Sequence, residues 1–186
     1  MPNFTKNAIK ASFLKLLNER PLSKITIKDI VTDCGINRNS FYYHYQDIPS
    51  LIEEVIKEET DSIINQYPTI STFEECLKIA VEFALKNKKA VFHIYNSTNR
   101  NIFEHYLWNA CQYVVLTYIN TAFADYQVAE SDKNIIVKFY RCEIFGQIIW
   151  WLDSGMQDDL LESNQRLCEL RKGMTEELFR RSSDSK

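Results

Sequence analysis

Residues 25–45 read ITIKDIVTDCGINRNSFYYHY, and this stretch decides how the N-terminal part of the chain folds. Thr26 stands three residues before Asp29, which is the spacing of a helix-capping box and predicts the start of a short helix. Gly35 supplies the left-handed turn that closes this helix, and Asn37 can cap the next one. Two short helices joined by a glycine-containing turn form a helix-turn-helix.

The second of these helices, from Arg38 to about Tyr45, carries four aromatic rings, an imidazole and a guanidinium. At about 100° per residue, Phe41 and Tyr45 lie roughly 40° apart and can pack together on the first helix of the chain. Asn39 and Tyr43 point the opposite way, with Arg38 and Tyr42 on one flank and Ser40 and His44 on the other. Such a helix suits a DNA major groove, where its middle reads base edges and its flanks contact phosphates. Tyrosines that snorkel at a domain interface are the alternative.

Charge is distributed unevenly along the 186 residues, although the net charge is only −3. Residues 1–47 carry seven basic and four acidic side chains, and the remainder carries a net −6. A basic head on an acidic body favours a polyanion at one end of the molecule. No apolar run has the length of a membrane span, and the five cysteines lack metal-binding spacing. These features predict a cytoplasmic protein with free thiols and without a metal or cofactor.

Helical periodicity continues through the rest of the chain, and no segment has the alternation of a strand. The sequence therefore predicts an all-α fold of about nine helices, with a helix-turn-helix domain over residues 1–47 and a helical C-terminal domain over residues 48–186. The expected helices span about 5–19, 27–34, 38–45, 48–66, 72–88, 90–96, 100–126, 132–154 and 158–180.

The pattern Thr-Ile-x-x-Ile-Val, Gly-Ile-Asn and Phe-Tyr-Tyr-His-Tyr within residues 25–45 resembles the DNA-binding signature of the TetR/AcrR family of bacterial transcription regulators. The version Asn-Arg-x-Ser-Phe-Tyr-Tyr-His is similar to the DhaS-like subgroup. The resemblance covers about the first quarter of the chain. It implies a sequence-specific regulator, more often a repressor, that binds a palindromic operator as a homodimer and is released by a small-molecule effector.

The resemblance also implies which residues contact DNA. Thr26 would contact a phosphate, and Phe41 and Tyr45 would belong to the core. The full set of predicted DNA-binding residues is Thr26, Lys28, Asn37, Arg38, Asn39, Ser40, Tyr42, Tyr43 and His44. One position departs from the family, which often has a lysine at the start of the fourth helix where this chain has Ile48. A phosphate contact there is in doubt, although backbone N–H groups can still face an anion.

Residues 139–152, FYRCEIFGQIIWWL, are apolar around nearly the whole helix circumference, which predicts burial on every side. The second covered face is expected to come from another subunit, and Gly146 lets two helices approach closely. The alternative is the central helix of a monomeric bundle. The predicted dimer interface comprises Gly146, Ile149, Trp150, Leu167, Leu170 and Met174.

An effector pocket needs mostly apolar walls with a few polar groups, and the middle helices are rich in aromatic residues. The expected lining is Phe83, Phe92, His93, Tyr95, Tyr106, Trp108, Tyr113, Arg141 and Phe145. Each of these aromatic residues is also an ordinary core candidate.

Enzymatic motifs are missing: the sequence has no GxSxG, P-loop, GxGxxG or HExxH pattern. The leading prediction is thus a DNA-binding regulator that is not an enzyme. The alternatives are an activator, or a helical interaction module controlled by a protein partner, since DhaS-like relatives can act with a protein coactivator.

Overall fold

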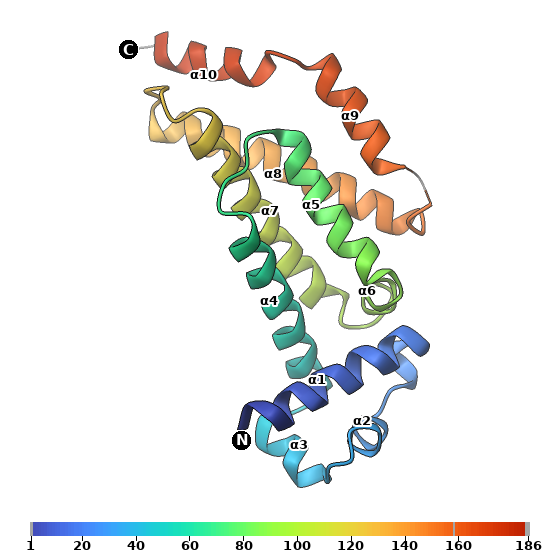
Figure 1. Cartoon of the computed structure of the whole chain (residues 1–186). Coiled ribbons are helices and arrows are strands. Elements are labelled where there is room, and N and C mark those ends of the chain that lie inside the picture. The colour runs from blue at the N-terminus through green and yellow to red at the C-terminus, as the bar shows by residue number, and fades with distance from the viewer. Residues whose placement is uncertain (1, 158, 185–186) are drawn as a thin grey trace. The chain divides into compact units, whose positions relative to one another are not determined.

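The computed structural model describes residues 2–157 and 159–184, without the side chains of residues 2, 3, 63, 76, 77, 80, 82, 83, 86 and 184. These residues form ten α-helices and one 3-10 helix, and none of them lies in a strand. The all-α prediction is therefore confirmed (Figure 1). In chain order the helices are α1 (Pro2–Glu19), η1 (Leu22–Lys24), α2 (Ile27–Asp33), α3 (Arg38–His44), α4 (Ile48–Gln66), α5 (Phe73–Lys86), α6 (Lys88–Tyr95), α7 (Arg100–Ala122), α8 (Glu130–Asp153), α9 (Leu160–Leu170) and α10 (Met174–Asp184).

The last predicted helix, 158–180, is divided in the structure. Leu160–Leu170 and Met174–Asp184 are separate helices joined by a short turn, so there are ten helices rather than about nine. Gly173 adopts a φ of +84°, a left-handed conformation that an α-helix cannot continue through. The sequence LRKGM contains this stop signal, because a glycine that follows basic residues is typical of a helix C-terminus.

The chain groups into two compact units. The head unit comprises residues 1–61 and 84–106, and the body unit comprises residues 62–83 and 107–186. The head unit thus contains α6, which lies far along the chain from the helix-turn-helix. The domain boundary that the sequence suggests between residues 47 and 48 stays a prediction.

The core of the head unit is built on the apolar stripe of α1. Ile9, Phe13 and Leu17 are fully buried, and their spacing of four residues places them along one side of the helix. The ring nitrogen Nδ1 of His93 on α6 lies 2.7 Å from the carbonyl oxygen of Leu17. Because a carbonyl only accepts, this nitrogen is the donor, and it satisfies a carbonyl in the last turn of α1 that has no partner within its own helix.

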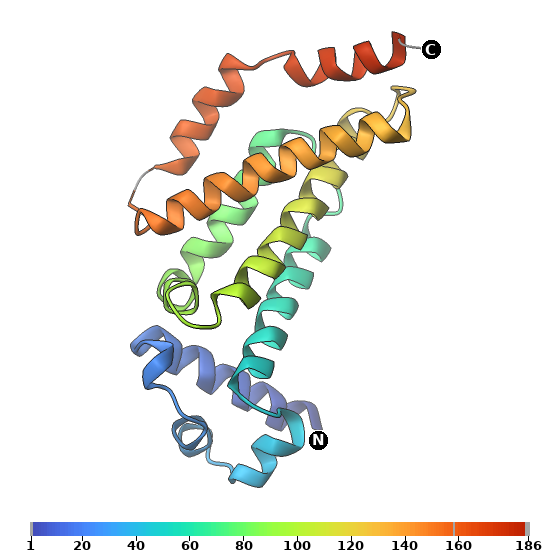
Figure 2. The same ribbon diagram turned by 180° about the vertical axis from the view of Figure 1, so that it is seen from behind.

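In the body unit, α9 and α10 run beside α8 and meet at a bend (Figure 1, Figure 2). Phe179 of α10 stacks on Phe123 with ring centroids 4.4 Å apart. The buried hydroxyl groups of Tyr140 and Thr175 lie 2.5 Å apart and share a hydrogen bond. These contacts attach the C-terminal helix to α8 and to the residue that directly follows α7. Within the described residues, no helix has the length and apolar composition needed to cross a membrane.

Candidate nucleic-acid interface

The start of α2 is fixed by the capping box that the sequence predicts. The N–H of Asp29 donates to Oγ1 of Thr26 at 3.3 Å, and the N–H of Thr26 donates to Oδ2 of Asp29 at 2.9 Å. The Thr26 hydroxyl also donates to the same carboxylate oxygen at 2.7 Å. These bonds, with the neighbouring Arg20 guanidinium, lower the pKa of Asp29. The Thr26 side chain is exposed, but its proton is already used within the cap.

The turn between α2 and α3 depends on Gly35, whose φ is +70°. The N–H of Ile36 donates to the carbonyl oxygen of Val31 at 3.0 Å, closing the end of α2 in the pattern that follows a left-handed residue. A side chain at position 35 has free space but would be strained by this backbone conformation. The predicted left-handed turn is therefore confirmed.

The predicted cap of α3 is confirmed as well. Oδ1 of Asn37 accepts hydrogen bonds from the N–H of Ser40 at 2.8 Å and from its hydroxyl at 3.1 Å. The side-chain oxygen of Asn37 therefore holds the helix start, and its amide NH₂ is the part that remains to face a ligand. This cap fixes the direction in which the rest of α3 leaves the turn.

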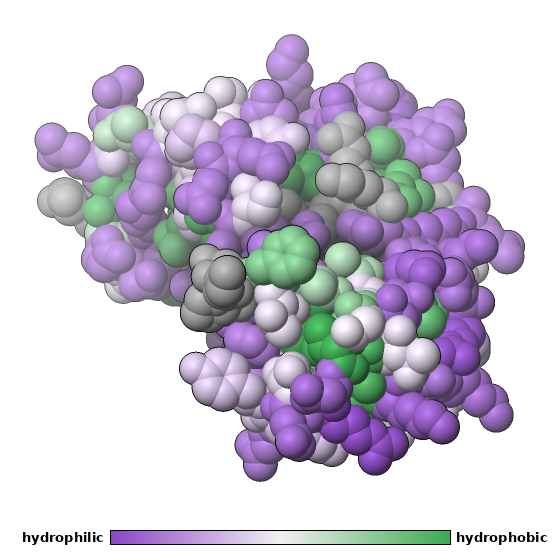
Figure 3. Space-filling view, turned by 60° about the horizontal axis from the view of Figure 1, so that its bottom comes forward, coloured by the Kyte–Doolittle hydropathy of each residue, from purple (hydrophilic) through white to green (hydrophobic). Residues whose placement is uncertain are grey.

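The faces of α3 divide as the helical wheel predicts. Phe41 and Tyr45 are buried, at 0% and 3% exposure, with ring centroids 5.7 Å apart. Tyr43 is 80% exposed and Tyr42 is 55% exposed, and Asn39 is exposed beside them. Figure 3 turns the bottom of Figure 1, where α2 and α3 lie, toward the viewer, and hydrophilic residues there surround a smaller hydrophobic patch. Large aromatic side chains held in solvent by a buried anchor form a surface suited to binding.

This geometry agrees with two family matches. Residues 12–55 match the model of "Bacterial regulatory proteins, tetR family", and residues 71–173 match "Transcriptional regulator C-terminal region", a TetR C-terminal model. The second match alone covers more than half of the chain. The chain belongs to the TetR family of transcriptional regulators.

Two individual proteins resemble this chain, one over part of its sequence and the other in its fold. An uncharacterized HTH-type transcriptional regulator of Bacillus subtilis (strain 168), YxbF, is 33% identical over 63 residues, which are 34% of this chain and only 17% of that protein. The structure of the dihydroxyacetone kinase operon activator DhaS matches with a TM-score of 0.73 and 18% identity over 89% of this chain and 93% of that one. At this identity, the structural match shows a shared fold.

The start of α4 is the place where this TetR-family chain departs from the family pattern. Asp47 caps the helix by accepting from the N–H of Ser50 at 2.8 Å, and Ile48 is half-buried. No cation stands among residues 46–52. The first turn of α4 thus presents a carboxylate and backbone groups and contains no cation.

Basic residues of the head fall into two groups. Four of the seven in residues 1–47 lie beside an acid: Lys6 at 2.7 Å from Glu54, Lys10 at 2.6 Å from Glu58, Lys15 at 2.5 Å from Asp33, and Arg20 at 3.4 Å from Asp29. Lys28 and Arg38, both predicted to contact DNA, are exposed and have no ion pair among the described residues. Lys24, which is not among the predicted DNA contacts, is also exposed and has no ion pair among the described residues.

The residues predicted to line an effector pocket are distributed over both units. Phe92, His93, Tyr95 and Tyr106 belong to the head unit, and Trp108, Tyr113, Arg141 and Phe145 to the body unit. The side chain of Phe83 lies outside the described residues.

Most of these predicted pocket residues have partners nearby. The Tyr106 hydroxyl donates to Glu53 at 3.2 Å, and the Tyr113 hydroxyl donates to the carbonyl oxygen of Ile64 at 3.3 Å. The structure does bring three of the predicted residues together: the Arg141 guanidinium lies 3.7 Å from the ring centroid of Trp108, which contacts Phe145 edge-on at 5.1 Å. Burial lowers the pKa of Arg141.

A second exposed surface lies on α8, α9 and α10 and includes the predicted dimer interface. Leu170 is 68% exposed, Trp150 58% and Met174 56%, while Gly146 is exposed and Ile149 half-buried. Leu167 is also exposed, and it lines a groove of about 720 Å³ together with Phe139 and Met174. We call the exposed apolar residues of these three helices the α8–α10 face.

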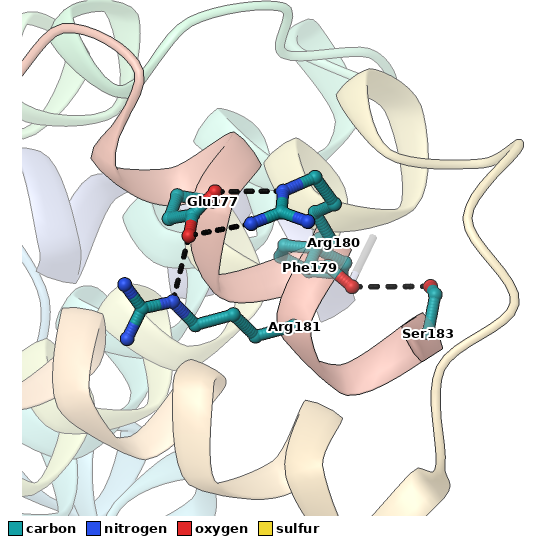
Figure 4. A network of polar contacts seen from close by, with 5 residues as sticks. All are labelled: Glu177, Phe179, Arg180, Arg181 and Ser183. Carbon is teal, nitrogen blue, oxygen red and sulfur yellow. Dashed lines mark hydrogen bonds and ion pairs between the residues drawn. The ribbon is translucent and has the colours of Figure 1, made fainter. Parts of the chain in front are cut away.

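Charged residues along this groove are paired within the chain. Glu143 accepts from Nη1 of Arg171 at 2.6 Å, and both side chains are largely buried. On α10, Glu177 accepts from Arg180 and Arg181, and Ser183 donates to the carbonyl oxygen of Phe179 (Figure 4). The two arginines lower the pKa of Glu177 to about 2, so this carboxylate is ionised at neutral pH. The pairing leaves the α8–α10 face predominantly apolar.

Proposed function

We propose that this TetR-family chain is a sequence-specific DNA-binding regulator that acts as a homodimer on a palindromic operator. The observation that carries the proposal is the arrangement of α3, in which buried Phe41 and Tyr45 anchor a helix whose other faces expose Asn39, Tyr42 and Tyr43. A helix that is capped at its start and packed along one side can enter a major groove without losing its shape.

Selection of bound sequences from a random pool of DNA duplexes tests this function directly. We expect a palindromic site whose half-sites are separated by one helical turn, about 34–36 Å, because the two heads of a dimer must enter successive major grooves. Recovery of no sequence above background would favour a helical interaction module instead. A single half-site without symmetry would contradict the homodimer.

Base readout and phosphate contact by α3 can be separated by substitution. Truncating Asn39 or Tyr43 to alanine is expected to change the preferred bases and to cost roughly 1–3 kcal/mol at the affected position. Truncating Tyr42 or His44 is expected to weaken binding to all sequences about equally, because phosphates are alike. Affinities for a set of single-base operator variants measure both effects. A change of base preference in Tyr42→Phe with none in Tyr43→Phe would contradict this assignment.

The α8–α10 face supports the homodimer. Exposed apolar patches of this kind mark interaction sites in soluble proteins. On α8, Phe139, Cys142, Gly146 and Trp150 are all exposed, and their spacing of three to four residues places them on one side of the helix. In a two-fold interface the same patch meets its copy, and Gly146 removes the side chain that would hold two helices apart.

Cross-linking at Cys142 measures this arrangement in solution. With a short bis-maleimide we expect a covalent dimer of the wild type that is lost in Cys142→Ser, because helices that cross near Gly146 bring the two Cys142 thiols close together. Cys34 and Cys168 are half-buried and are expected to react more slowly. Light scattering that shows a dimer while Cys142 fails to cross-link would place the interface on another surface.

Repression is the proposed sign of regulation, and activation is the alternative, since the structural neighbour DhaS is named as an operon activator. The sign depends on where the operator lies relative to a promoter. A reporter gene downstream of the selected operator, compared with and without the regulator, distinguishes the two. Lower expression with the regulator supports repression, and higher expression contradicts it.

Release by a small-molecule effector is the third part of the proposal. The cluster of Trp108, Arg141 and Phe145 supports it, because it combines aromatic rings with one cation, the mixture that a ligand site requires. A ligand must favour the released state by a few kcal/mol to act as a switch. Titration of the DNA complex with fractionated cell extract tests this: release by a small-molecule fraction supports an effector, and release only by a protein fraction favours a protein partner.

A further inference from the structure

The cations of residues 1–47 form two groups. Four of them form ion pairs that connect helices, and the others have no acidic partner among the described residues. Lys6 and Lys10 connect α1 to α4, and Lys15 and Arg20 connect α1 and the segment after it to α2. A cation that already neutralises a carboxylate contributes less to a phosphate, because the acid remains beside it.

Three cations of residues 1–47 remain without an ion pair among the described residues: Lys24, Lys28 and Arg38. They stand at the end of η1, at the second residue of α2 and at the first residue of α3. All three are exposed. Within residues 1–47, the positive charge that has no ion pair among the described residues therefore follows the chain from η1 to the start of α3.

Hydrogen bonds hold the backbone at Lys24, while its side chain is exposed and has no ion pair among the described residues. Its N–H donates to the carbonyl oxygen of Pro21 at 2.9 Å, and the next N–H, of Ile25, donates to Leu22 at 3.0 Å. Leu22 and Ile25 are buried on either side of it, at 6% and 5% exposure. The backbone of Lys24 is thus held two residues before Thr26, where the predicted interface begins.

Neither the Thr26 hydroxyl nor the start of α4 offers a phosphate an unused cation or hydroxyl donor. The Thr26 hydroxyl donates to Asp29 within the capping box, so it must release this bond before it can donate to DNA. On the other side of α3, the start of α4 presents Asp47 and Ile48 and contains no cation. Tyr42 and His44 are predicted to meet the DNA backbone, and they lie on opposite flanks of α3.

We propose that Lys24 of this regulator contacts a DNA phosphate, and that the cations that contact DNA phosphates lie mainly on the η1–α2 side of α3. Lys24 and Lys28 neutralise phosphates on that side, and on the α4 side hydrogen-bond donors contact phosphates without a lysine. The inference rests on the proposed DNA-binding function and adds to it a residue and an asymmetry of charge.

The salt dependence of binding tests the role of Lys24. The probe is a labelled duplex of about 30 base pairs that carries the selected operator, and affinity is measured between 50 and 200 mM salt. Loss of one phosphate contact per subunit lowers the slope of log affinity against log salt by about 0.9, or about 1.8 per dimer. We therefore expect Lys24→Gln to reduce the slope by this amount on operator and on mixed-sequence duplex alike, with Lys24→Arg close to the wild type.

The matched control is Lys57→Gln, which removes the same charge from another exposed lysine of the head unit, one that has no ion pair within the part of the chain that the structure describes. Lys57 lies nine residues into α4, roughly 14 Å along the helix axis, which exceeds the screening length of about 8 Å at physiological salt. Its slope is expected to match the wild type. Equal thermal melting of all variants excludes a folding effect.

A gain-of-charge variant tests the proposed asymmetry. Ile48→Lys places a cation on the α4 side, and we expect it to steepen the salt slope by up to the amount that Lys24→Gln removes. If Lys24→Gln keeps the wild-type slope on a duplex that the wild type binds, this inference is wrong while the proposed function stands. An unchanged slope in Ile48→Lys contradicts the asymmetry. Failure of the wild type to bind any duplex defeats the proposed function and, with it, the role of Lys24.

Discussion

Replacing Leu170 with glutamate is expected to weaken the proposed homodimer about a thousandfold and to abolish binding to the proposed operator at nanomolar concentrations. Leu170 is 68% exposed in the single chain and lies on the α8–α10 face. Each leucine withdrawn from contact costs about 1.5–3 kcal/mol, and two-fold symmetry counts every substitution twice. At about 1.4 kcal/mol per factor of ten, the loss reaches about three orders of magnitude, before the cost of burying a charge is added.

Light scattering over a range of protein concentrations measures this effect. Gln165→Glu is the control, because it adds the same charge to the same helix at an exposed position about 140° away from Leu170. It is expected to remain a dimer. Retention of a dimer by Leu170→Glu at micromolar concentration, with wild-type affinity for the operator, would exclude the α8–α10 face as the interface.

Replacing Phe41 with alanine is expected to lower the free energy of unfolding of the head unit by about 3–5 kcal/mol. Phe41 has no exposed surface, and its ring contacts those of Tyr42 and Tyr45 at 5.8 and 5.7 Å between centroids. The α3 helix has only seven residues and cannot form stably in isolation, so its shape depends on this anchor. Such a loss is a large part of the stability of a typical domain, about 5–15 kcal/mol.

Urea denaturation followed by circular dichroism gives the change in free energy. Tyr43→Ala is the matched control: it removes an aromatic ring of similar size from the same helix, but from a position that is 80% exposed. Its unfolding free energy is expected to stay within about 0.5 kcal/mol of the wild type, although its DNA binding changes. A similar loss in both variants would mean that Tyr43 is also part of the folded core.

The sequence of this chain does not specify whether the aromatic residues of its middle helices line an effector pocket. Aromatic residues such as Tyr106 and Trp108 are only two positions apart, yet they belong to different compact units and have different partners. A helix wheel gives the direction of a side chain relative to its own helix. It does not say which other helix lies there, and so it does not distinguish a pocket wall from a packed core.

The sequence by itself determined the helix-turn-helix and the all-α class. The capping box of Thr26, the left-handed Gly35 and the cap at Asn37 all act over three or four residues, so their partners can be read directly from the spacing. The buried pair Phe41 and Tyr45 follows from helical geometry in the same way. The bend at Gly173 was equally local, and its signal was present in the chain.

Only the tertiary structure decided which charges are free. Lys6 finds Glu54 across 48 residues of sequence, and His93 of α6 reaches Leu17 across 76. Such pairs form because packed helices bring distant side chains within hydrogen-bonding range, and no spacing along the chain encodes them. Four cations of residues 1–47 are used in this way, and Lys24 has no ion pair among the described residues, so the proposed contact of Lys24 with DNA depends on packing and not on the local sequence around it.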